Sequence, residues 1–112
     1  AGTATASYTY AGDTNHSGSS DSENFTIDPA SSTTTVSCPA NVTYTGSAQT
    51  PCTVSVTGDG GLSLAPTASY LNNTNAGTAT ASYTYAGDAN HSGSSDSENF
   101  TIDPASSTTT SM

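Results

Sequence analysis

The chain contains no lysine and no arginine, while its nine acidic residues give it a formal net charge of -9. Without a permanent cation it has no group to hold phosphates, which argues against nucleic-acid binding, a phosphate-binding loop and attraction to anionic membranes. For the same reason we expect no direct salt bridges and no Lys-Asn isopeptide crosslinks. We therefore expect the acidic side chains to be solvated, hydrogen-bonded or bound to cations.

Large apolar residues are also scarce, because Phe, Leu, Ile and Val together number eleven and tryptophan is absent. With this net charge, such a composition is typical of disorder, so a mucin-like spacer is one alternative. No apolar run approaches the ~20 residues of a membrane span, and we expect no membrane insertion. No signal peptide or initiator methionine opens the chain, which we interpret as a mature or excised piece.

Only two cysteines are present, Cys38 and Cys52. An even pair in a Ser/Thr-rich chain predicts one disulfide and an oxidising location, extracellular or at the cell surface. Closing a loop of about 15 residues contributes about 3 kcal/mol in the chain-entropy model, a large share for so thin a core. Two free buried thiols are the alternative. Zinc is disfavoured because two cysteines without nearby histidines supply too few ligands.

What the sequence has in abundance is repetition. Residues 1–35 recur at 76–110 with a single change, Thr14 against Ala89, so the repeat is 75 residues long. Near-identical copies suit an array in which each unit repeats one mechanical task, whereas an enzyme needs a single site.

The repeat divides the chain into three parts. Residues 1–29 are the C-terminal half of a preceding repeat, 30–103 make one complete repeat, and 104–112 begin the next repeat or a linker. The final Ser111 and Met112 depart from the Val-Ser that the repeat predicts there. A half repeat would expose an apolar face, so we expect missing strands from polypeptide ahead of Ala1, or from strand exchange between copies.

Apolar residues alternate with polar ones in several short segments, as in half-buried strands. The clearest are Thr78–Tyr85, the segment around Phe100 and Ile102, and Cys52–Val56, while the Gly-, Asp- and Ser-rich residues 86–98 read as a loop. No segment has a helical period. The sequence predicts an all-β sandwich of six or seven strands per repeat, with both cysteines on inward faces.

Two stretches carry a family resemblance. The run ASYTYAGDANHSGSS at 81–95 resembles the signature of bacterial Ig-like repeat domains, and VTYTGSAQTPCTVSVTG at 42–58 is similar to the entry strands of related repeats in large secreted surface proteins. The resemblance implies an immunoglobulin-like β-sandwich in tandem repeats of 75 residues. It also implies a role as an extender in adhesins, stalks or extracellular filaments.

Six N-x-S/T sequons are candidate N-glycosylation sites, and the alternative is a plain polar β surface. Their asparagines are Asn15, Asn24, Asn41, Asn72, Asn90 and Asn99.

The loop that begins at Asp88 partly resembles a calcium loop, although Asn99 stands where a bidentate Glu is required. Its candidate calcium ligands are Asp88, Asn90, Ser92, Asp96 and Glu98. The alternative is an Asx-type turn in which Asp88 and Asn90 cap their own backbone.

Catalysis has no foothold, because no G-x-S-x-G motif exists and His16 and His91 lack a nearby activated nucleophile. We expect both histidines to be packing residues and Tyr83 and Tyr85 to fill the core rather than form a sugar-stacking platform.

We therefore expect the chain to be a non-enzymatic, glycosylated segment of an extracellular filament or cell-surface stalk. Its partner is expected to be another copy of itself, placed head to tail along a fibre or as a tandem neighbour in one chain. The alternative is an adhesin module whose loop 86–97 contacts a glycan or host surface. A folded repeat should advance the fibre axis by roughly 30 to 50 Å.

Overall fold

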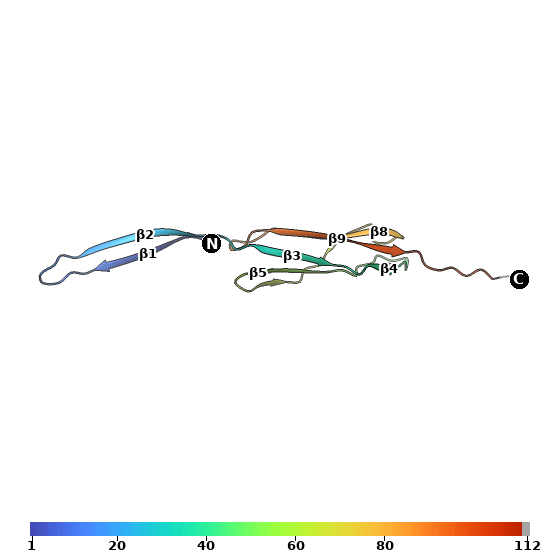
Figure 1. The fold of residues 1–112 in the computed structure, drawn as a ribbon, viewed down its shortest axis with the longest axis horizontal. Helices are drawn as coiled ribbons and strands as arrows, with labels where there is room; N and C mark the ends of the chain where they lie inside the picture. The colour runs from blue at the N-terminus through green and yellow to red at the C-terminus, as the bar shows by residue number, and fades with distance from the viewer. Residues whose placement is uncertain (111–112) are drawn as a thin grey trace.

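The computed structural model describes residues 1–110 as an all-β molecule, which confirms the expected class. Ser111 and Met112, where the sequence departs from its repeat, lie outside the described residues. The molecule is a thin rod of 114 × 17 × 16 Å, with a hairpin at one end joined end to end to a two-sheet unit (Figure 1).

The hairpin consists of β1 (Gly2–Tyr10) and β2 (Ser19–Ile27). Its strands pair antiparallel in the same register as β8 (Gly77–Tyr85) and β9 (Ser94–Asp103), the equivalent strands of the next copy. Identical strand sequences have therefore produced the same pairing in two different surroundings, with β9 one residue longer than β2.

Residues 32–103, which we call the two-sheet unit, contain seven strands. One sheet has the order β3-β5-β6 and the other the order β4-β9-β8-β7, with β4 parallel to β9. The remaining bounds are β3 (Ser32–Ser37), β4 (Asn41–Thr43), β5 (Thr53–Gly58), β6 (Leu62–Leu64) and β7 (Ser69–Leu71).

The core lies between the two sheets, as expected of a β-sandwich. Alternate residues of each strand point inward, so a few aliphatic side chains fill it. The buried apolar residues are Val36, Val54, Val56, Ala79, Ala81, Phe100 and Ile102. Tyr70 completes one end by meeting Phe100 edge to face, with ring centroids 6.2 Å apart.

The predicted disulfide between Cys38 and Cys52 is confirmed. Cys38 directly follows β3 and Cys52 directly precedes β5, so the bond extends the antiparallel ladder of these two strands by one step. It packs against both groups of core side chains. The bond therefore staples two neighbours of one sheet beside the core, and it does not link the two sheets.

The assignment of residues 86–98 to a loop was too long, because β9 already begins at Ser94. The segment Ser94–Glu98 has no large apolar residue, yet its side chains bond to β3, which lies beside it. This part of β9 pairs with residues 81–85 of β8, and β2 begins at the equivalent Ser19 with no β3 beside it. The ladder of the hairpin therefore defines the strand, and the polar contacts to β3 add to it.

Candidate functional site: the joint between hairpin and two-sheet unit

The linker that leaves the hairpin is held by the β8–β9 loop of the two-sheet unit. The Ala30 N–H donates to the Asn90 carbonyl at 2.9 Å, and the Ser92 N–H donates to the Ala30 carbonyl at 2.8 Å. Ala30 thereby pairs with the loop as a one-residue parallel strand. Ser32, the first residue of β3, donates its hydroxyl to the Ser92 carbonyl at 2.6 Å. We call this region the joint.

The loop that forms the joint is preorganised by its own turn. An Asp88 carboxylate oxygen accepts from the Asn90 N–H at 2.8 Å, and the Asp88 N–H donates to the His91 carbonyl at 3.0 Å. This is the Asx-type turn that the sequence left open as one alternative. Gly87 has φ +91°, and a Cβ there would lie 2.7 Å from the His91 carbonyl oxygen, so only glycine fits.

His91 links this loop to a second turn, the one between β5 and β6. Its Nδ1 lies 2.9 Å from a carboxylate oxygen of Asp88, and its Nε2 lies 2.6 Å from the Asp59 carbonyl oxygen. Both partners are acceptors, so the arrangement is fully satisfied when both ring nitrogens donate, as they do in the imidazolium form. With no lysine or arginine in the chain, the only side chain of the complete repeat that can carry a positive charge is His91, at the joint.

The electrostatics of the joint agree with this arrangement. The Asp59 carbonyl, and then the Asp88 carboxylate, raise the pKa of His91 above its ordinary 6.5. The Asn90 N–H, and then the His91 ring, lower the pKa of Asp88 from 3.8 to about 2. Burial, followed by the hydrogen bond to Asp88, raises the pKa of Tyr85. These shifts favour an ion pair between Asp88 and protonated His91, so the expectation of no direct salt bridges was wrong at this position, because histidine can supply the cation that lysine and arginine do not.

A ladder of polar side chains continues from the joint along β9 and onto the free edge of β3. The Ser94 hydroxyl bonds those of Ser32 and Thr34, at 2.8 and 2.7 Å. Further along, the Asp96 carboxylate accepts from the Val36 N–H at 2.8 Å, and that of Glu98 from the Cys38 N–H at 3.3 Å. These bonds cap an edge strand that would otherwise offer unpaired N–H groups to other chains.

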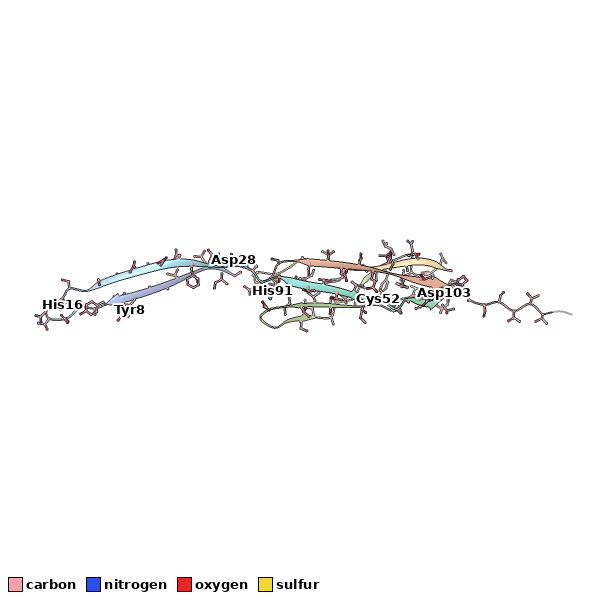
Figure 2. The ribbon with its side chains drawn as sticks, in the orientation of Figure 1. Tyr8, His16, Asp28, Cys52, His91 and Asp103 are labelled. Atoms are coloured by element: carbon pink, nitrogen blue, oxygen red, sulfur yellow. A yellow bond between two sulfur atoms is a disulfide. The ribbon has the colours of Figure 1, made fainter. Side chains whose placement is uncertain are left out.

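The first copy shows the same side chains without these partners. The side chain of His16 is 71% exposed at the tip of the hairpin, whereas that of His91 is 11% exposed where the two parts meet (Figure 2). His16 keeps its bond to Asp13 at 2.9 Å, the equivalent of His91 to Asp88. The turn therefore forms by itself, while its enclosure depends on a linker and a second turn packing against it.

The structure leaves the candidate glycosylation sites open to solvent. All six sequon asparagines are exposed. Asn24 and Asn99 each accept a hydrogen bond from a cross-strand threonine hydroxyl, and Asn41 donates to Asp103. Glycosylation at these positions stays a prediction.

The candidate calcium ligands are spread over the joint and β9. Asp88 bonds to its own turn, Asp96 bonds to the backbone of β3, and Glu98 bonds to the backbone of Cys38 just after β3. Within residues 1–110, no group of three or more His, Cys, Asp or Glu side chains is placed to hold a metal ion. Calcium binding by this loop stays a prediction.

The tyrosines and hollows carry no evident chemistry. Tyr83 and Tyr85 pack against the core, and the Tyr70 hydroxyl accepts from the Cys52 N–H at 3.0 Å. A hollow of about 490 Å³ is lined by residues 72–78, which include no ionisable side chain. No helix in the part of the chain that the structure describes is long and apolar enough to cross a membrane.

Sequence reasoning missed the joint. His91 was expected to be a packing residue, and neither Ala30 nor Asp59 was singled out. The available signal was composition, since one histidine is the only basic side chain in the complete repeat and its position is the same in both copies.

The comparisons with known proteins give no family for this chain. No protein-family model matches it, and no match is found among curated proteins or solved structures.

Proposed function

We propose that the chain is a segment of an extracellular filament or cell-surface stalk built from tandem Ig-like β-sandwiches, with no catalytic role. The observation that carries this proposal is the joint. The linker between two copies is held by backbone bonds from Ala30 to the β8–β9 loop, and His91 ties that loop to the β5–β6 turn. A pinned linker keeps successive units in line, which a load-bearing or spacing array requires.

The rod shape supports the same function. In Figure 1, β2 runs through the linker into β3 in one direction along the long axis. The sequence repeat places Ser94 one unit after Ser19, and Ser94 lies level with Ser32 because their hydroxyls are 2.8 Å apart. The axial advance per repeat is then the extended length from Ser19 to Ser32, thirteen steps at about 3.3 Å, or about 43 Å.

The disulfide supports an extracytoplasmic location, and the exposed sequons support glycosylation of the chain. The adhesin alternative is less well supported, because Asp88, Asn90, His91 and Ser92 of the loop it would use already bond within the joint. A binding array in which a single repeat captured one glycan would favour the adhesin.

The direct test is an image of the native assembly. Electron microscopy should show unbranched threads with an axial period of about 43 Å. A compact solitary particle, or a flexible chain without a period, would contradict the proposal. Circular dichroism of the oxidised chain, which should show β structure, separates the filament from the mucin-like spacer.

A further inference from the structure

The hairpin carries an apolar face that nothing covers. Phe25 is 53% exposed and Ile27 is 51% exposed, although their equivalents Phe100 and Ile102 are 2% and 1% exposed. Ala4, Ala6, Tyr8 and Tyr10 lie on the same strands, and we call this set, with Phe25 and Ile27, the uncovered face. A two-stranded hairpin with one apolar face is at best marginally stable in water.

The second copy shows what fits this face. The core of the two-sheet unit has two groups of side chains. In the first, Ala81 of β8 packs with Val36, Val54 and Val56. In the second, Val42 and Tyr70 pack against Ala79, Phe100 and Ile102, and the disulfide touches both groups. The three valines of the first group, Val42, Tyr70 and the disulfide all come from residues 30–75. The uncovered face is therefore equivalent to one side of the core interface of the second copy, and the other side of that interface is formed by residues 30–75.

Polar groups on the hairpin also lack partners that residues 30–75 supply in the second copy. Asp96 accepts from the Val36 backbone, whereas its equivalent Asp21 bonds only to the N–H of its neighbour Ser22. The exposed His16 corresponds to His91, whose second ring nitrogen bonds the Asp59 carbonyl. The uncovered face, the Asp21 carboxylate and the His16 imidazole therefore all lack the partners that residues 30–75 give to their equivalents in the second copy.

The chain cannot satisfy both hairpins with its own residues, because it has two hairpins and one 30–75 segment. That segment leads directly into Ala76, which is the same residue as Ala1 in the repeat. A segment attached ahead of Ala1 would reach the uncovered face as residues 30–75 reach β8 and β9.

We propose that the uncovered face is completed by a copy of residues 30–75 from the neighbouring repeat, joined immediately ahead of Ala1. The completed unit repeats the two-sheet unit: Phe25 and Ile27 are buried, Asp21 caps the edge of the added first strand, and His16 closes a second joint. This inference deepens the proposed function by naming the contact that propagates the array.

The test extends the full chain by one copy of residues 30–75 placed ahead of Ala1. Amide hydrogen exchange is followed by NMR in both the extended and the original chain. In the extended chain the amides of β1 and β2 should slow by roughly 100-fold or more, to rates like those of β8 and β9. The His16 ring signals should shift toward those of His91. The matched control carries Val36→Ser and Val56→Ser in the added copy alone, and it should leave β1 and β2 unprotected.

Three results would overturn the inference. They are unchanged exchange of β1 and β2 in the extended chain, equal protection in the control, and protection of the original chain that rises with its concentration. The last would assign the face to a second chain. If exchange does not change while native threads keep their period, the inference fails and the filament stands. If β1 and β2 become protected in the extended chain but the native assembly shows no threads, the inference stands and the filament proposal fails.

Discussion

The Nε2 atom of His91 lies 2.6 Å from the carbonyl oxygen of Asp59, so one imidazole joins the β8–β9 loop to the β5–β6 turn. The other ring nitrogen is held by Asp88. Through Ala30, the same loop also holds the linker from the preceding copy. One small loop therefore organises both the end of a unit and the entry of the chain into it.

The joint predicts a pH dependence of stability. Because the pKa of His91 is raised in the folded state, its contribution is fully present below 6.5 and is lost as the pH rises through the folded value. Because the pKa of Asp88 is lowered to about 2, its contribution is present above 3.8 and is lost as the pH falls toward 2. The Asp88–His91 pair should therefore stabilise the folded chain most between pH 3.8 and 6.5. The measurement is the Tm of the chain at intervals of about one pH unit from about pH 2 to about pH 9.

The matched variants for this pH profile are His91→Gln and His16→Gln. The first should lower Tm below pH 6.5 and remove the decline above it, since glutamine carries no proton to lose. The second should leave the profile unchanged, because His16 is exposed at the hairpin tip. Equal effects of the two substitutions would mean that the enclosed imidazole has no special role.

The two copies of phenylalanine offer a matched test of the core. Phe100→Ala removes a buried ring and should cost about 3 to 5 kcal/mol, enough to unfold so small a unit. Phe25→Ala, at the equivalent exposed position, should change stability by less than about 0.5 kcal/mol. Urea unfolding followed by circular dichroism measures both. A large effect of Phe25→Ala would show that the hairpin face is covered in solution.

The edge cap of β3 can be tested at Asp96. Asp96→Ala leaves the Val36 N–H without its charged acceptor and should destabilise the unit by about 1.5 kcal/mol. Asp96→Asn keeps a carbonyl acceptor and should cost less. Asp21→Ala is the control in the other copy, and it should be neutral because Asp21 bonds only to Ser22. Self-association of the Asp96→Ala variant in ultracentrifugation would support the role as an edge cap.

Reducing the disulfide should remove about 3 kcal/mol, because the open chain regains the freedom of the closed loop. The expected result is a large fall in Tm after treatment with a reductant, matched by Cys38→Ser with Cys52→Ser. A Tm that does not change on reduction would mean that the core holds without the crosslink.

Local patterns predicted some features and could not predict others. Alternation in TATASYTY and around Val54 and Val56 identified β8 and β5, because the two-residue period of a buried face is visible in neighbouring residues. The start of β9 at Ser94 escaped notice, because residues 94–98 show no apolar alternation and are paired with β8 by backbone bonds that any side chain allows. The contact between His91 and Asp59 likewise joins residues that nothing in the local sequence connects.

The Cys38–Cys52 bond also governs how such a thread responds to pulling. When tension unravels a unit from its ends, the stretch between the two sulfurs stays out of the line of force. At about 3.5 Å per residue, this withholds roughly 45 Å of contour from each unit. In the proposed filament, each unit would therefore lengthen less under load than an uncrosslinked unit of the same size.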